Sequence, residues 1–174
     1  MANITAAAVN ELRKRTGVGM MDCKKALVEC DGDMDKAIDY LREKGQKLAA
    51  KRADRDASEG AVLATVNADK TFAAVIMMNC ETDFVAKNED FVAFTKQVLQ
   101  TAVDAKAKSL EEVMALTING ISVETMIVEQ VAKIGEKITL SHYYPIEAVA
   151  TYAYVHPGNR MASVVGLSKA GYDE

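Results

Sequence analysis

The fold is decided by residues 72–88, which read FAAVIMMNCETDFVAKN. The first part, Phe72 to Met78, is apolar throughout. This segment is too short to span a membrane and is typical of a buried strand. Asn88, followed by two acidic residues, predicts a helix start, because an amide can cap the first turn and acids favour the positive end of the helix dipole. The intervening Thr82-Asp83-Phe84 is therefore expected on a tight turn between strand and helix.

The carboxylate and the aromatic ring of this turn allow two interpretations. Turns at strand ends present side chains on a rigid scaffold, so Asp83 beside Phe84 can form a contact surface for a partner. Alternatively, Asp83 caps the local turn and Phe84 fills the core. The residue types alone leave both interpretations open.

Composition indicates an ordinary globular protein. Of 174 residues, 49% are hydrophobic and 26% charged, which is enough apolar material for a real core. The net charge of −4 argues against binding of nucleic acid through a general basic field. No glycine-rich phosphate loop follows a strand, so we expect no nucleotide cofactor.

The three cysteines, Cys23, Cys30 and Cys80, lack the pair spacing of a zinc site and leave an odd thiol. This pattern fits a reduced protein of the cytoplasm, in which Cys23 and Cys30 are small core residues. The first residues contain neither the basic nor the apolar region of a secretion signal. We therefore expect a cytoplasmic protein that is not attached to a membrane.

Residues 1–45 are expected to form a three-helix module. Apolar residues recur at helical spacing in three segments between residues 3 and 45. Asp22 is expected to cap the second helix, Asp33 to cap the third, and Gly45 to end it. Residues 46–59 carry mixed charge and several alanines, which indicates a linker or a helical extension.

Residues 60–174 are expected to form an α+β core domain, an antiparallel β-sheet with packed helices. The predicted strands span residues 61–67, 71–79, 138–146, 150–156 and 160–167, and helices are expected after Asn88, Ser109 and Ser122. Helical spacing assigns to the core the residues Phe91, Phe94, Val98, Thr101 and Ala102. An uncovered hairpin is marginal, so the final one predicts a domain truncated at its C-terminal end.

Two motifs give the chain a family resemblance. They are Leu12–Leu27, LRKRTGVGMMDCKKAL, and Thr82–Lys87, TDFVAK. In this order and separation they resemble bacterial translation elongation factor Ts, the guanine nucleotide exchange factor for the GTPase elongation factor Tu. The first module of that family is similar to the ubiquitin-associated fold.

The resemblance implies elongation factor Tu as partner and gives each motif a role. Phe84 would be a wedge near the Mg²⁺ site of the partner, Asp83 would contact the same region, and Arg13 to Leu27 would dock on the nucleotide-binding domain. After His156 the family often has two glycines or Gly-Ala, whereas this chain has Pro157-Gly158-Asn159. The partner-binding residues that the resemblance implies are Arg13, Val18, Met20, Met21, Lys24, Leu27, Thr82, Asp83, Phe84, Val85, Ile134, Gly135 and His156.

Two other function classes compete with an exchange factor. A three-helix adaptor would explain residues 1–45 only. A hydrolase would use Cys80 with His142 or His156, but a thiol beside an apolar strand is usually inert and no orienting third group is evident. We therefore expect a regulatory protein without bond-making or bond-breaking chemistry and without catalytic residues.

Overall fold

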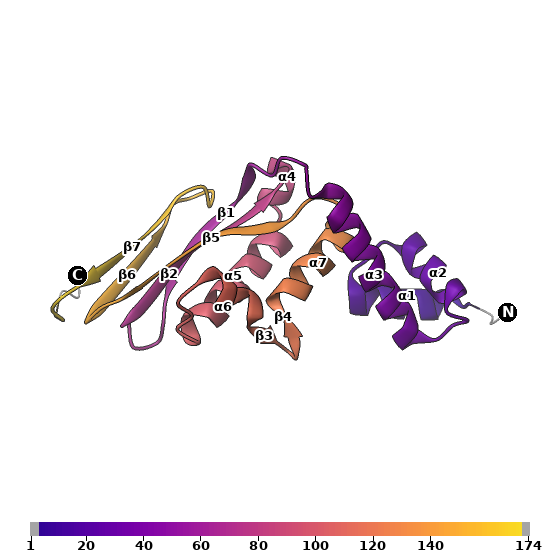
Figure 1. Cartoon of the computed structure of the whole chain (residues 1–174), viewed down its shortest axis with the longest axis horizontal. Coiled ribbons are helices and arrows are strands. Elements are labelled where there is room, and N and C mark those ends of the chain that lie inside the picture. The colour runs from indigo at the N-terminus through magenta and orange to yellow at the C-terminus, as the bar shows by residue number, and fades with distance from the viewer. Residues whose placement is uncertain (1–3, 172–174) are drawn as a thin grey trace. The chain divides into compact units, whose positions relative to one another are not determined.

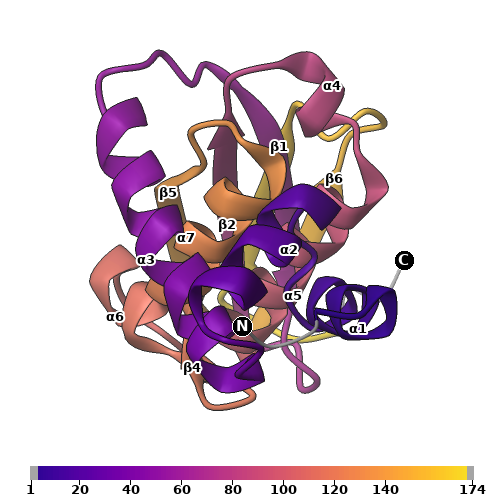
Figure 2. The same ribbon diagram turned by 90° about the vertical axis from the view of Figure 1, so that its right-hand side faces the viewer.

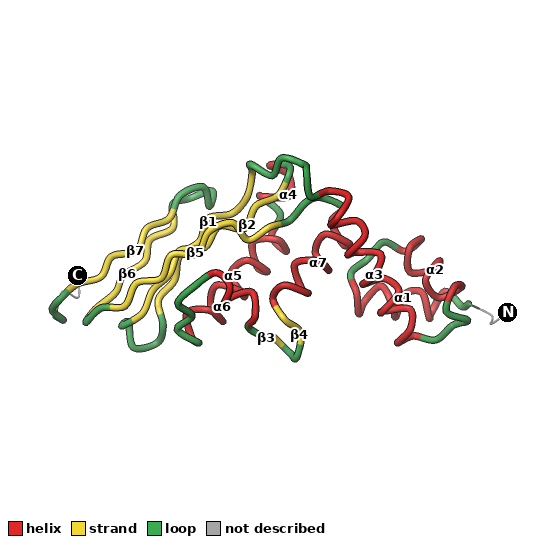
Figure 3. The backbone as a smooth tube through the Cα atoms, viewed as in Figure 1, coloured by secondary structure: helices red, strands yellow, loops and turns green. Residues whose placement is uncertain are grey.

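The chain forms two compact units, which are described separately (Figure 1). The computed structural model describes residues 4–171, so the ends of the chain, 1–3 and 172–174, lie outside the description. The first unit combines residues 1–55 with 125–137, and the second combines 56–124 with 138–174. Helices and antiparallel strands occur together, which confirms the predicted α+β class (Figure 3). Within residues 4–171, no helix has the length and apolarity needed to cross a membrane.

The first unit contains the three helices that the sequence predicts, and also most of a fourth. Their bounds are α1 Ala6–Thr16, α2 Met20–Glu29, α3 Met34–Arg52 and α7 Val123–Ile134. Asp33 caps α3 as predicted, since its side chain accepts a hydrogen bond from the Lys36 amide. Leu12, Cys23 and Leu27 are fully buried, so a small apolar core joins the first three helices.

Two predictions about the ends of these helices are wrong. Helix α2 begins after Gly19 without a side-chain cap, and Asp22 lies in its first turn, where it pairs with Lys44 at 2.5 Å. Helix α3 continues through Gly45 because this glycine is a packing site. A Cβ atom there would lie 3.0 Å from Ala132 Cβ on α7, so the missing side chain lets the two helices approach closely.

The second unit is built on a three-stranded antiparallel sheet in the order β1-β2-β5. The strands are β1 Glu59–Val66, β2 Phe72–Cys80 and β5 Thr139–Glu147. The central position of β2 explains its apolar sequence, because both of its faces are covered. Helix α5, Glu89–Asp104, lies on one face, and the hairpin of β6, Ala150–Val155, and β7, Ala162–Leu167, lies on the other (Figures 1 and 3).

Shorter elements complete this unit: α4 Asp83–Ala86, α6 Leu110–Ala115, β3 Thr117–Ile118 and β4 Ile121–Ser122. The predicted caps Asn88 and Ser109 are confirmed: Asn88 Oδ1 accepts from two amides of α5, and Ser109 Oγ accepts from the Glu112 amide. The core prediction for α5 holds for Phe91, Phe94, Val98 and Ala102. It is wrong for Thr101, which is only half-buried and donates to the Gln97 carbonyl.

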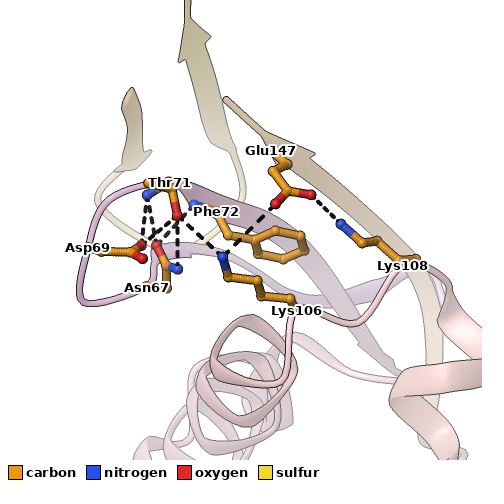
Figure 4. Close-up of polar contacts among 7 residues, drawn as sticks. All are labelled: Asn67, Asp69, Thr71, Phe72, Lys106, Lys108 and Glu147. Carbon is orange, nitrogen blue, oxygen red and sulfur yellow. Dashed lines mark hydrogen bonds and ion pairs between the residues drawn. The ribbon is translucent and has the colours of Figure 1, made fainter. Parts of the chain in front are cut away.

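A polar cluster fixes the start of β2, at the end of the strand away from Thr82 (Figure 4). Asn67 Oδ1 accepts from the amides of Thr71 and Phe72, each at 2.9 Å. Lys108 Nζ pairs with Glu147 at 2.5 Å and lies 4.9 Å from the centre of the buried Phe72 ring. The hydrogen bond and positive charge of Lys108 lower the pKa of Glu147.

This lowered pKa predicts a loss of stability in acid. A carboxyl whose pKa is lower in the folded state stabilises that state above its unfolded pKa, here 4.5, and stops doing so as the pH falls through the folded value. Glu147→Gln should therefore lower the melting temperature at pH 7 and have a smaller effect at pH 3. Thermal melts of both proteins between pH 7 and pH 3 test this, and an equal difference at both ends would contradict it.

Candidate partner-binding surfaces

Hydrogen bonds from buried residues fix the turn that follows β2. Thr82 caps the one-turn helix α4, with its Oγ1 accepting from the Val85 amide at 3.4 Å. Its carbonyl oxygen accepts both the Ala86 amide, at 3.1 Å, and the buried Cys80 thiol, at 3.2 Å. Ala86 is itself buried. Residues 83–85 thus lie between Thr82 and Ala86, whose positions are fixed by these hydrogen bonds and by burial.

Phe84 is the exposed residue of this three-residue segment. Its side chain is 83% exposed, the largest value among the exposed large hydrophobic residues of the described chain. The core-plug interpretation of Phe84 is therefore wrong. A phenylalanine gains about 1.5–3 kcal/mol from full burial, so a ring held in water on an anchored turn is suited to insertion into a partner.

Asp83 is ionised and already paired. Its Oδ2 lies 2.6 Å from Lys87 Nζ, one helical turn away. The hydrogen bond and charge of Lys87 lower the pKa of Asp83, and the charge of Arg160 adds to this effect. Thr82 and Val85 are half-buried beside it. We call residues 82–85 the Phe84 turn.

A second exposed apolar surface lies on α2. Met20, Met21 and Val28 are 48%, 70% and 54% exposed. A shallow depression beside them is lined by Met21, Lys24, Lys25, Val28 and Glu29. Methionine side chains adapt well to a partner, and the flanking lysines give this α2 surface a positive rim. Val28 was not identified as a surface residue from the sequence. The signal was present, because Val28 does not share the helical spacing of the buried residues Cys23, Ala26 and Leu27.

Two residues that the resemblance placed in the contact lie inside the first unit. Val18 is 5% exposed and Leu27 is fully buried in the three-helix core. Their side chains are not accessible to a partner in this conformation and instead pack in the core of the first unit. Arg13 and Lys24 are exposed and available.

The remaining expected residues stand at element ends. Ile134 is the last residue of α7, and Gly135 follows with a φ of 82°, its amide bonded to the Val131 carbonyl at 2.8 Å. His156 follows β6 and is exposed, with Nδ1 2.9 Å from the Tyr154 hydroxyl. The first unit thus carries the α2 surface with Ile134 and Gly135, and the second carries the Phe84 turn with His156.

Exposed apolar side chains of this kind, an anchored aromatic on one unit and methionines on a helix of the other, are typical of protein-binding surfaces. Known sequences identify the family. The family model described as elongation factor TS matches residues 81–174, and the one described as the N-terminal region of mitochondrial elongation factor Ts matches residues 1–49. The chain belongs to the elongation factor Ts family.

Curated relatives named elongation factor Ts align along almost the whole chain. The protein of Christiangramia forsetii is 54% identical over 170 residues, which cover 98% of this chain and 61% of the relative. The protein of Flavobacterium johnsoniae is 51% identical, with 97% and 52% covered, and that of Rhodopirellula baltica is 47% identical, with 100% and 53% covered. The chain thus spans little more than half the length of these relatives.

The exposure of Phe84 predicts that its ring contributes little to folding. Phe84→Ala should change the melting temperature by no more than a surface substitution, within about ±0.5 kcal/mol of stability. Phe91, 1% exposed in the core, is the matched control, and Phe91→Ala should cost about 3–5 kcal/mol. Thermal melts of the two variants test the contrast. A melting temperature of Phe84→Ala close to that of Phe91→Ala would show that the ring supports the fold.

Proposed function

We propose that this chain is a guanine nucleotide exchange factor for elongation factor Tu, acting in protein synthesis in the cytoplasm. The observation that carries the proposal is the Phe84 ring, exposed on a turn that buried groups anchor. The sequence of this turn is the TDFVAK motif by which the chain resembles the family. Membership of the elongation factor Ts family, with about half of the residues identical to curated relatives, supports the assignment.

The mechanism follows from how a GTPase holds its nucleotide. Backbone amides and Mg²⁺ supply much of that grip, so a side chain that displaces the elements around the ion weakens nucleotide binding. By reciprocity, the nucleotide must weaken binding of the exchange factor by the same factor. Phe84 is proposed as the displacing wedge, with the ionised Asp83 beside it on the same turn. The α2 surface is proposed to dock on the nucleotide-binding domain.

Two surfaces are needed for a stable contact. A specific interface buries at least about 1,000 Å² in total, more than one aromatic turn can supply. The α2 surface, with Arg13, Ile134 and Gly135, is proposed as the first contact and the Phe84 turn, with His156, as the second. An adaptor that acts through residues 1–45 alone would leave the exposed Phe84 ring without a role.

No bond-making chemistry is proposed for this chain. Cys80, the thiol considered as a nucleophile, is 0% exposed, and its sulfur donates to the Thr82 carbonyl. This position gives Cys80 a structural role under the Phe84 turn. His142 and His156 are exposed, with Nδ1 contacts to Ser141 and Tyr154 respectively. We also propose no direct contact with nucleic acid, in keeping with the net charge of −4.

The decisive experiment measures release of labelled GDP from elongation factor Tu. The chain should accelerate release, and Phe84→Ala should slow the stimulated rate at least about tenfold, since loss of 1.4 kcal/mol is one decade. Phe91→Ala, measured on its folded fraction, should retain the parent rate. A chain that binds elongation factor Tu but leaves GDP release unchanged would be an adaptor, and the exchange proposal would fail.

The docking role of α2 gives a separate prediction. Met21→Ala should raise the concentration of chain that half-saturates GDP release by about tenfold, as expected for an exposed anchor worth more than 1 kcal/mol, while the maximal rate is kept. Lys47→Ala, an exposed change on α3, is the control and should have no effect. Equal half-saturating concentrations for the parent chain, Met21→Ala and Lys47→Ala would show that α2 is not part of the contact.

A further inference from the structure

The turn that joins β6 to β7 is fastened to the first strand of the sheet. The turn residues Gly158 and Asn159 have φ values of 90° and 55°. The Asn159 carbonyl accepts the Val62 amide of β1 at 2.8 Å. This backbone bond joins the hairpin to β1 although the two belong to separate sheets.

Arg160 adds a second link at the same place. Its Nη2 lies 2.5 Å from Glu59 Oε2, and Glu59 is the first residue of β1. Glu59 pairs across the sheet with Cys80, whose thiol supports the Phe84 turn. One ion pair thus connects the β6–β7 turn to the start of β1, which lies opposite the end of β2 that precedes the Phe84 turn.

His156 is part of the fastened turn. Its amide donates to the Met161 carbonyl at 2.8 Å, and its carbonyl accepts the Asn159 amide at 3.0 Å. Arg160 lies in the chain between Asn159 and Met161, and both of these residues are hydrogen-bonded to His156. The β6–β7 turn lies at the same end of the sheet as α4 (Figures 1 and 2).

The charges at this end are arranged around Arg160. Its guanidinium group pairs with Glu59 and is near enough to the Asp83 carboxylate to contribute to that group's lowered pKa. Arg160 itself is 62% exposed, so its ion pair remains accessible to water. An exposed pair of this kind contributes little to overall stability. Its effect should instead be local, on the position of the turn.

We propose that Arg160 is a positioning residue. By pairing with Glu59 it holds the β6–β7 turn, which contains His156, beside the Phe84 turn, so that the two turns contact the partner as one surface. The inference rests on the proposed exchange function and adds a residue to it. Arg160 acts through the turn and does not need to touch the partner. Loss of the pair therefore weakens docking and leaves the wedge itself intact.

The test measures GDP release from elongation factor Tu over a range of chain concentrations. Arg160→Ala should raise the half-saturating concentration about threefold, the size of effect expected for one exposed ion pair, and keep the maximal rate. Glu59→Ala should give the same change, and the double variant should be no worse than either single one, because both remove one interaction. Lys108→Ala, which removes an ion pair of similar exposure at the other end of β2, should leave release unchanged.

Four outcomes would overturn the inference. A defect in Arg160→Ala with none in Glu59→Ala would mean that Arg160 contacts the partner directly. Additive defects would mean that the two residues act separately. Parent behaviour in both variants, or a lowered maximal rate, would remove the positioning role.

A second readout needs no partner. Hydrogen exchange of the Val62 amide, bonded to the turn, should be faster in both Arg160→Ala and Glu59→Ala than in the parent, and unchanged in Lys108→Ala. Unchanged exchange in the first two would refute the anchoring role. A parent chain that does not accelerate GDP release would contradict the proposed function itself. An active parent chain, with Arg160→Ala and Glu59→Ala behaving like the parent, would contradict this inference alone.

Discussion

The hydrogen bonds to the Thr82 carbonyl are the interaction on which the candidate site depends. One comes from the buried Cys80 thiol and one from the Ala86 amide, so the chain is fixed on both sides of Phe84. An exposed aromatic on a mobile loop would lose conformational entropy on binding. Here that ordering cost is largely met by folding, which leaves more of the ring's burial energy for a partner.

The same end of the sheet gathers charges whose individual contributions to stability are small. Asp83 with Lys87 and Glu59 with Arg160 are exposed pairs, which typically contribute between 0 and about 1 kcal/mol. Their arrangement matters more for geometry. Lys87 holds the Asp83 carboxylate on its own turn, and Arg160 links the neighbouring turn to β1.

The two candidate surfaces differ in how they are supported. The Phe84 turn extends from the central strand of a sheet that is covered on both faces. The α2 surface belongs to a unit with a small helical core, in which Val18 and Leu27 are buried. Glycine at position 45 allows α7 to pack closely on α3, so a segment 87 residues further along the chain, at Ala132, completes this unit. An anchored aromatic and an adaptable methionine surface suit the displacement and docking that we propose for them.

The sequence by itself determined the longer helices and strands and the caps of α3, α5 and α6. The apolar run of β2, the Asn88 and Asp33 caps and the final β6–β7 hairpin follow from local patterns, because capping and alternation act between near neighbours. The expected contact residues came largely from motif resemblance. Only the tertiary structure decided whether each of these side chains is exposed. Phe84 and Leu27 are both apolar residues within recognisable motifs, yet one is in water and the other in the core, since burial depends on what distant segments cover. For the same reason Gly45, which locally favours a helix end, lies within a helix: its role is set by Ala132, far away in sequence, and no local pattern contains that contact.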